Sequence, residues 1–397
     1  MRLAVELYDT VIGTLDGSPR TFDFTAAEAG IERFGMNSPV LSTTIPLVPA
    51  PRRGQATRRR NWFAELLPEG DQYASMLRQG QLRDGDVPGF LARYGRDIAG
   101  AVQLWDLDDP TEPKTPSSRP VTAEQIREIL EDPLGTPLAN APILGKSSLG
   151  GVQPKVVLVR TADGWAQALG GYPTTHILKP QLSGDLAPVI YDEEYGSRLA
   201  RRLGLMDYRT EIQVFDGLPA LVIERYDRQE GRRLHQEDFS QALGASGNQK
   251  YQELGGIVSL ERVAGTLRRY APEEDLRHLA RMVITTVAIG NLDQHTKNLG
   301  LLHYADGSVR VAPAYDLAPQ AQYANDGKLA LAVNREYRHA SARLRRTPRA
   351  RHPLTPSRRP RRRGRPRSIA AECPRGLRAS DVELLPFVLR HPGEIDA

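Results

Sequence analysis

Cysteine is almost absent from this sequence of 397 residues. The single Cys373 excludes an intrachain disulfide and any zinc site built on several cysteines. No run approaches the roughly 18 uncharged apolar residues of a membrane-spanning helix, and the stretch MRLAVELYDT lacks the apolar centre of a signal peptide. We therefore expect a cytoplasmic protein, and its 40% hydrophobic content can supply a substantial core.

Acids and lysine are missing from residues 338–367, which hold 13 arginines. Without these arginines the chain has 40 basic and 48 acidic residues, so its net charge changes from +5 to −8. Because the body of the chain is acidic, the overall positive charge does not imply a general nucleic-acid-binding surface.

The same C-terminal segment also lacks a helical period, and residues 339–368 carry five prolines. Burial of its few apolar residues cannot offset the conformational entropy that the segment would lose on ordering. We therefore expect residues 338–397 to be disordered. Since the chain is rich in Arg and poor in Lys, as GC-rich genes encode, we hypothesise that this segment is a frameshift product. The alternative is a nucleic-acid-binding arm, because closely spaced guanidinium groups contact phosphates.

The remaining chain divides into a module, a linker and a larger domain. Residues 1–106 combine strand-like segments with the helical stretch NWFAELLPEGD, which predicts an α/β module with its own core. Residues 107–121 are rich in Pro, Ser and Asp, which indicates a linker. Residues 122–337 mix helical and strand-like patterns, so the predicted fold class is α+β.

Within the larger domain, a helix over residues 193–205 is predicted, with Tyr195, Leu199 and Leu203 on one face. A longer helix is predicted to begin near Pro272 and to end at Gly290, which can stop it. Strands are expected at residues 175–180 and 220–228.

The stretch GNLDQHTKNLG, residues 290–300, places an acid, an imidazole, an amine and an amide within six residues. Two short apolar strands around Asp306-Gly307 follow it and predict a hairpin. A hairpin returns the chain to its start, so Asp316 is expected near Asp293 and Asn298. This set suits phosphoryl transfer, which needs a carboxylate for the attacking hydroxyl and oxygen ligands for magnesium. The D-x-x-x-x-N spacing is also that of a kinase catalytic loop.

Cations for the phosphates are expected upstream. Gly150 and Gly151 allow a phosphate to approach the backbone closely, and Lys179 on a strand can reach phosphate oxygens. A glutamate on the next helix can orient that lysine; Glu193 and Glu194 compete for this role, and we favour Glu194. The order of these parts is that of protein kinases.

Several blocks of the sequence, taken together and in order, resemble the HipA family of serine/threonine kinases, the toxins of bacterial toxin–antitoxin pairs. The resemblance covers about Leu3 to Tyr337 and is carried by FAELLPEGD, GRDIAGAVQLW, SSLGGVQPK, HILKP, ERYDR, LHQEDFSQALG, GNLDQHTKN and AYDLAP. It implies a HipA N-terminal module and a bilobal kinase-like domain. The C-terminal lobe would be mainly helical, and we expect it to be truncated, because the resemblance stops near Arg338.

The resemblance also implies roles for individual residues, with ATP and Mg2+ as cofactors. Asp293 is the implied catalytic base, and Ser148 the implied autophosphorylation site whose modification ejects the phosphate loop; by chemistry alone Ser147 is an equal candidate. The implied magnesium ligands are Asn298 and Asp316. The implied ATP-binding residues are Val152, Gln153, Pro154 and Lys155 in the phosphate loop, Lys179, the hinge residues Glu224, Arg225 and Tyr226, and His295, Lys297, Asn298, Tyr315 and Asp316.

Partners follow from the resemblance in the same way. It implies a cytoplasmic aminoacyl-tRNA synthetase as the substrate and a helix-turn-helix antitoxin of the HipB type, through which alone the protein would reach DNA. No membrane contact is expected. The alternative is an inactive, truncated remnant that only binds the antitoxin. The LLPEG stretch is expected to be structural, and the role of HQEDF stays open.

Overall fold

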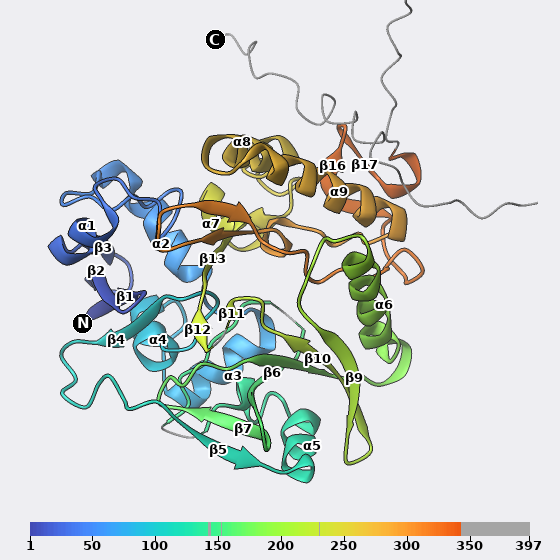
Figure 1. Cartoon of the computed structure of the whole chain (residues 1–397), viewed down its shortest axis with the longest axis horizontal. Helices are drawn as coiled ribbons and strands as arrows, with labels where there is room; N and C mark the ends of the chain where they lie inside the picture. Colours follow the sequence, from blue (N-terminus) through green and yellow to red (C-terminus); the bar gives the residue numbers. More distant parts are fainter. Residues whose placement is uncertain (142–143, 152, 230, 343–397) are drawn as a thin grey trace, which may run out of the picture.

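The N-terminal part of the computed structural model is a small antiparallel sheet with helices around it (Figure 1). The structure describes residues 1–141, 144–151, 153–229 and 231–342. Strands β1 (Arg2–Leu7), β2 (Thr10–Asp16), β3 (Asp23–Ala26) and β4 (Gln103–Asp106) lie in the order β3-β2-β1-β4. The helices are α1 (Glu28–Phe34), α2 (Ala56–Ala64), α3 (Gly70–Gly80) and α4 (Val87–Tyr94).

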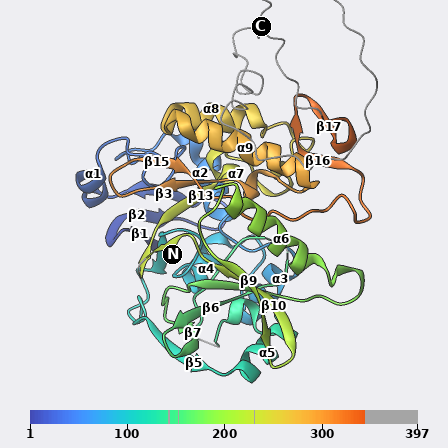
Figure 2. The same cartoon turned by 45° about the vertical axis from the view of Figure 1, so that its right-hand side comes forward.

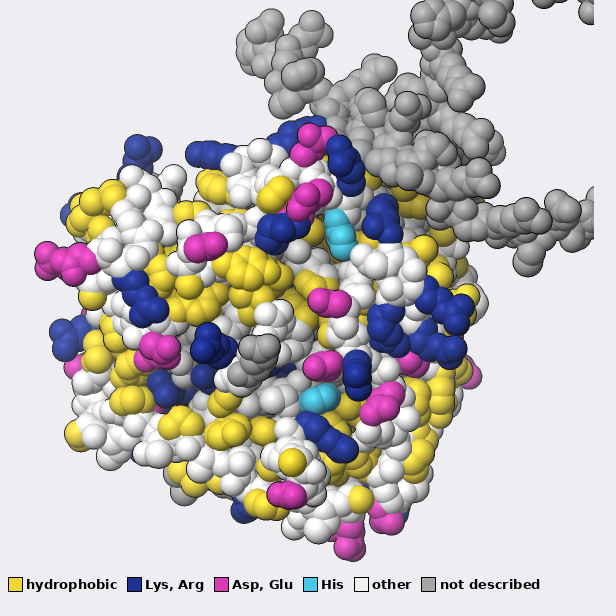
Figure 3. Space-filling view, in the orientation of Figure 1, with side chains coloured by type: hydrophobic (Ala, Val, Ile, Leu, Met, Phe, Trp, Pro, Cys, Tyr) yellow, Lys and Arg dark blue, Asp and Glu magenta, His cyan; other side chains and the backbone are white. Residues whose placement is uncertain are grey.

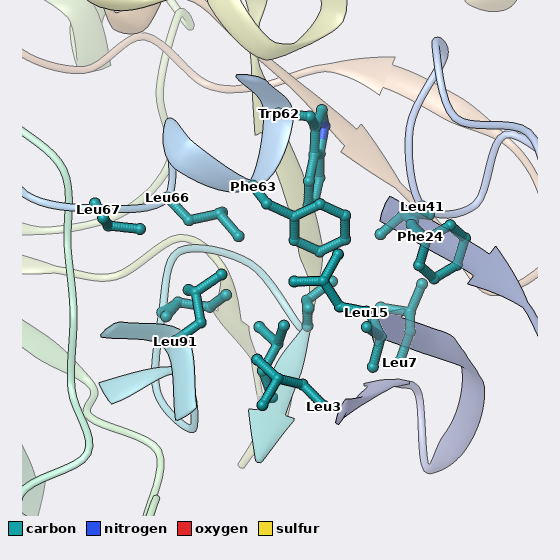
Figure 4. Packing of buried hydrophobic residues seen from close by; sticks show 14 of the residues in the cluster. Leu3, Leu7, Leu15, Phe24, Leu41, Trp62, Phe63, Leu66, Leu67 and Leu91 are labelled. Carbon is teal, nitrogen blue, oxygen red and sulfur yellow. The ribbon is translucent and has the colours of Figure 1, made fainter. Parts of the chain in front are cut away.

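The core of this module extends beyond it. Phe63, from the end of α2, lies beside Leu15 of the sheet, and Leu66, just after α2, lies near Leu91 of α4 (Figure 4). The same cluster includes Leu138, Leu149 and Val157 from the larger domain. The module therefore has an apolar core of its own, and that core continues into the larger domain.

A six-stranded sheet forms one lobe of the larger domain. Its strands are β5 (Ser117–Val121), β6 (Val156–Thr161), β7 (Gly164–Leu169), β8 (His176–Pro180), β9 (Thr210–Phe215) and β10 (Leu218–Glu224), in the order β5-β7-β6-β8-β10-β9. Helices α5 (Ala123–Glu131) and α6 (Val189–Arg202) belong to this lobe. The end of the expected linker is thus a strand, and Pro120 fits there because β5 is an edge strand.

Helix α6 buries a different face from the predicted one. Tyr195 is 60% exposed, whereas Glu193 and Gly196 are buried. A Cβ atom on Gly196 would lie 1.7 Å from the carbonyl oxygen of Leu317. The helix therefore packs closely against the chain that follows Asp316, and this contact selects small residues rather than an apolar stripe.

The second lobe contains α7 (Phe239–Leu243), α8 (Leu260–Tyr270) and α9 (Glu273–Ile289). Its strands are β13 (His235–Asp238), β14 (Gly300–His303) and β15 (Val309–Val311) in one sheet, and β16 (Lys328–Val333) with β17 (Glu336–Arg338) in another; β11 (Arg228–Gln229) and β12 (Arg232–Arg233) form a short ribbon before them. Helices α8 and α9 lie at the opposite end from β5 and α5 in both views (Figures 1 and 2), which confirms a bilobal α+β fold.

Two local predictions around the second lobe are confirmed. Helix α9 ends at Gly290, which takes a left-handed conformation with φ of 69°. Strands β14 and β15 pair antiparallel around Asp306 and Gly307. The loop between α9 and β14 is therefore held at both ends.

The first residues of the segment predicted to be disordered are ordered. Arg338 ends β17, and the Nε2–H of His339 donates a hydrogen bond of 2.8 Å to the carbonyl oxygen of Val287. Ala342 packs against the core of the second lobe. The rest of the predicted disordered segment, residues 343–397, lies outside the described residues.

Charge is mixed over the surface that Figure 3 shows, where Lys and Arg side chains are interspersed with Asp and Glu. Among the helices that the structure describes, none has the length and apolar character to span a bilayer.

Candidate active site

A cavity of about 340 Å³ lies where the two lobes meet. It is lined from both lobes by the segment before β6, β8, α6, the segment after β10, the loop before β14 and the chain after β15. Most of the site residues expected from the sequence line it: Gln153, Lys155, Lys179, Glu224, Arg225, Tyr226, Asp293, His295, Lys297, Asn298, Tyr315 and Asp316. Pro154 and Ser148 do not line it, and Val152 lies outside the described residues.

Lys179 on β8 joins the two lobes through its ammonium group. Its Nζ lies 2.7 Å from Glu193 on α6 and 2.6 Å from Asp316. Burial lowers the pKa of Lys179, but the two carboxylates outweigh burial and hold it above its ordinary value. Burial likewise raises the pKa of Asp316, yet the charge of Lys179 lowers it further, so Asp316 stays ionised. The lysine is therefore a fixed positive charge in the cavity.

The prediction that Glu194 orients Lys179 is wrong. Glu194 instead accepts hydrogen bonds from Arg201 and Thr210. Glu193 lies on the buried face of α6, together with Ile190 and Ser197.

The loop after α9 folds back on itself around Asp293. The side-chain amide of Asn298 donates to the backbone carbonyl oxygen of Asp293 at 2.9 Å, which turns both residues toward the cavity. Tyr251 donates its hydroxyl to Oδ1 of Asp293 at 3.0 Å. Burial lowers the pKa of His295, whose Nε2 is 4.0 Å from Asp293. The His295 ring packs edge-on against Tyr251, with ring centroids 5.2 Å apart.

Asp316 sits in a backbone conformation that few non-glycine residues adopt. Its φ is +51°, in the left-handed region. Its side chain is 44% exposed and faces the cavity, although its ion pair with Lys179 is short. Backbone strain of this kind persists where the surroundings impose it, often at functional sites.

Two carboxylates of the FAELLPEGD block, one of them in the LLPEG stretch, also enter the site, a contribution that the sequence analysis missed. Glu65 lies 2.8 Å from Lys297, and Glu69 lies 2.7 Å from Lys250. Burial lowers the pKa of Lys297, but Asp238 and Glu65 outweigh burial and raise it above its ordinary value. The N-terminal module therefore anchors Lys297, in the loop between α9 and β14, beyond its packing role.

The glycine turn carries a second buried lysine. Lys155 donates to the carbonyl oxygen of Gly150, and Gly151 has a φ of +100°, which a side chain would disfavour. Burial and the nearby charge of Lys179 lower the pKa of Lys155 to about 8. Gln153 has a buried Nε2 atom without a hydrogen-bond partner in the described structure. The turn therefore offers a ligand the unpartnered side-chain nitrogen of Gln153 and the ammonium group of Lys155, which loses its charge near pH 8.

Ser148 lies behind this turn and is fully buried. Its N–H donates to the carbonyl oxygen of Asp97 at 2.9 Å, and its hydroxyl donates to Leu66 at 3.3 Å. Ser147 donates its hydroxyl to the Asp97 carboxylate at 3.0 Å. Neither serine can receive a phosphoryl group unless the segment moves out.

Asp97 also reaches the segment after β10. It is fully buried and lies 2.9 Å from Arg228 and 3.7 Å from Arg225. Burial raises the pKa of Asp97, but the arginines outweigh burial and lower it. One side chain of the N-terminal module therefore holds the serine segment and the hinge region together.

Among residues 224–226, the segment expected to be the hinge, one backbone N–H group has no hydrogen-bond partner in the described structure. Glu224 donates its N–H to Arg209, and Arg225 donates its N–H to Thr175. In the described part of the chain, the N–H of Tyr226 has no hydrogen-bond partner. The Tyr226 ring stacks on Tyr315 with centroids 5.7 Å apart, and both residues line the cavity. A planar nucleotide base fits a site with these two aromatic rings and one free N–H, because its edge can accept a hydrogen bond.

The donor set fits a nucleotide with magnesium. Lys155 and Lys179 supply positive charge, and the oxygens of Asn298 and Asp316 suit a hard cation. Within residues 1–342, apart from the gaps, no group of three His, Cys, Asp or Glu side chains is arranged to hold a metal ion. Phosphate oxygens and water would therefore have to complete the coordination of any magnesium held here.

Comparisons with known proteins agree over most of the chain. The family model described as the HipA N-terminal domain matches residues 3–105, and that of the HipA-like C-terminal domain matches residues 147–375. The second match crosses residue 338, where the sequence analysis expected the resemblance to stop, so that expectation is wrong.

Individual relatives give the same result. The "Putative kinase Y4mE" of Sinorhizobium fredii is 34% identical over 70% of this chain and 70% of its own length. The "Serine/threonine-protein kinase toxin HipA" of Shewanella oneidensis is 28% identical over 85% of this chain and 79% of its own. The solved complex of Shewanella oneidensis HipA, HipB and operator DNA contains a chain with a TM-score of 0.72 and 26% identity, covering 86% of this chain and 82% of that one.

Proposed function

This chain belongs to the HipA family, whose matched relatives are named as kinases, and on that premise we propose that it is an ATP- and Mg2+-dependent serine/threonine protein kinase. The observation that carries the proposal is the single cavity in which Asp293, Asn298 and Asp316 face Lys155 and Lys179. These residues provide the carboxylate, the oxygen ligands for a metal and the cations that phosphoryl transfer requires.

In the proposed reaction, Asp293 orients the substrate hydroxyl and takes its proton. The hydroxyl oxygen bonds to the γ-phosphorus while the bond from phosphorus to the β–γ bridging oxygen breaks. Lys155 and Lys179 hold the phosphates, and Asn298 and Asp316 would hold Mg2+, which neutralises phosphate charge when bound. Tyr226 N–H would meet the edge of adenine, the hinge role implied for Glu224, Arg225 and Tyr226.

Transfer of labelled phosphate tests the proposal. The full chain is incubated with γ-labelled ATP, and phosphoamino-acid analysis identifies the labelled residues. We expect phosphoserine or phosphothreonine that depends on Mg2+ and disappears with a chelator. A folded chain that labels neither itself nor an added protein would contradict the proposal and favour an inactive antitoxin-binding protein.

Autophosphorylation of Ser148 is part of the proposal. A phosphate there would add about −1.5 to −2 charges beside the buried Asp97, so the segment could not return to its place. Loss of that packing would remove Lys155 from the cavity and stop the reaction.

Further proposals rest on the relatives alone. We propose a HipB-type antitoxin as a partner, since the matched Shewanella oneidensis structure contains HipB, and contact with DNA through that antitoxin. A cytoplasmic location and an aminoacyl-tRNA synthetase substrate remain proposals of the same kind.

The pKa of Lys155 predicts a pH dependence of ATP binding. Its ammonium is charged below about pH 8 and neutral above it. We therefore expect the Kd for ATP to rise by up to about tenfold per pH unit above pH 8, until the pKa of the complex is reached. Isothermal titration between pH 7 and 10 measures this change.

Lys155→Arg is the control, because arginine stays charged over this range. The variant should bind ATP with a Kd that is nearly constant between pH 7 and 10. A native protein without any pH dependence would show that Lys155 does not contact phosphate.

The two neighbouring glutamates of α6 give a matched pair of variants. Glu193→Gln should weaken ATP binding by about tenfold, because a charge-assisted hydrogen bond that orients Lys179 is lost. Glu194→Gln should change the Kd by no more than about twofold, since its partners are Arg201 and Thr210. Equal effects of the two substitutions would contradict the assigned role of Glu193.

A further inference from the structure

A second cavity, of about 530 Å³, adjoins the proposed ATP site on the other side of Asp293. Tyr251, Asp293 and Gln320 line both cavities. It opens between α6 and β16, which lie on the same side of the molecule in both views (Figures 1 and 2). A group bound there would lie next to the carboxylate that is proposed to take the proton.

Part of the lining of this second cavity is apolar. Leu186 and Leu254, from opposite lobes, are 53% and 51% exposed and both line it. Leu292 and Leu329 contribute buried apolar surface. An apolar side chain of a partner would gain by covering the exposed leucines.

The charge of the lining is negative. Asp192, Asp293 and Asp326 line the cavity, and within the described residues none of them lies within ion-pair distance of a lysine or arginine. The lysine of the lining, Lys328, is already paired with Glu253 at 2.9 Å. Asp192 instead accepts hydrogen bonds from the neutral side chains of Gln322 and Tyr323. These acids favour a positively charged partner.

We propose that this cavity binds the segment of the protein substrate that flanks the phosphorylated serine or threonine. The segment would be extended, with an apolar side chain against Leu186 and Leu254 and a lysine or arginine facing Asp192 and Asp326. Its hydroxyl would then reach Asp293 from the side opposite the phosphates. This inference rests on the proposed kinase function and adds the recognition of its substrate.

A peptide library tests the substrate preference with the full chain. Serine peptides that vary one flanking position at a time are offered with labelled ATP. We expect kcat/KM to be at least about tenfold higher for peptides with Lys or Arg in place of Asp or Glu at a flanking position, and for Leu in place of Gly at another.

Leu254→Arg tests the location. It puts a positive charge at the mouth of the cavity, so KM for the preferred basic peptide should rise by about tenfold while the Kd for ATP stays unchanged. Val214→Arg is the matched control, because Val214 is 63% exposed on β9 and lines neither cavity. Its KM should equal that of the native protein.

The outcomes separate this inference from the kinase proposal. If the native chain phosphorylates peptides without regard to charge, or if Leu254→Arg leaves the peptide KM unchanged, the cavity is not the substrate site. If Leu254→Arg changes the oligomeric state by light scattering instead, the cavity joins two copies of the chain and the inference is overturned. If the native chain labels neither itself nor any peptide, the kinase proposal fails as well.

Discussion

Replacing Asp293 with Asn should lower the rate of phosphoryl transfer by about 10²- to 10⁴-fold, because an amide cannot accept the proton of the substrate hydroxyl. Asn keeps the size of the side chain and can still accept the hydrogen bond from Tyr251. The Kd for ATP should therefore stay close to that of the native protein. Single-turnover transfer of labelled phosphate, with ATP binding measured in parallel, separates the two effects.

Tyr251→Phe is the companion variant. It removes the hydrogen bond to Asp293 and leaves the carboxylate in place. The rate should fall by about ten- to a hundredfold, since a hydrogen bond to a charged carboxylate is worth about 1.5–3 kcal/mol. Asp293→Asn with a nearly native rate would show that another group takes the proton, and the assignment of the base would have to be abandoned.

Replacing Asp97 with Ala should destabilise the protein by about 3–5 kcal/mol, the usual cost of removing one partner from a buried ion pair. Arg228 would lose its pair at 2.9 Å, and the serine segment would lose the hydroxyl bond from Ser147. Equilibrium unfolding in urea measures the loss of free energy. Faster proteolysis around Ser148 should accompany it, because the segment loses its anchor.

An exposed aspartate serves as the control for this substitution. Asp163 lies in the turn between β6 and β7, and Asp163→Ala should change the free energy of unfolding by no more than about 0.5 kcal/mol. Arg225 and Arg228 keep a second carboxylate, Asp227, at 2.8 and 3.0 Å. A loss below about 1 kcal/mol for Asp97→Ala would mean that Asp227 alone neutralises both arginines.

Local rules predicted the parts of the site that are built within a short stretch of chain. The helix stop at Gly290 and the hairpin at Asp306 and Gly307 follow from the backbone freedom of glycine and from turn chemistry, and the structure contains both. These two features bring Asp293 and Asp316 to one cavity, so the central arrangement could be read from the sequence.

Features that depend on distant contacts could not be read in this way. The choice between Glu193 and Glu194 depends on which face of α6 packs on Leu317, and that segment lies more than a hundred residues later. Strand β5 has an exposed, Pro-bearing sequence, and only its partner β7 makes it a strand. The role of Glu65 could not be seen in the sequence, because its partner, Lys297, lies 232 residues later in the chain.

The buried ion pair between Asp97 and Arg228 also constrains when the protein can fold during its synthesis. Asp97 leaves the ribosome 131 residues before its partner Arg228, so at roughly 5–20 residues per second it waits on the order of ten seconds for its charge to be neutralised. During that interval neither the serine segment nor the hinge can close around it. A nascent chain therefore cannot assemble the complete cavity before the N-terminal module and the hinge have both been translated, and incomplete chains released earlier should be inert.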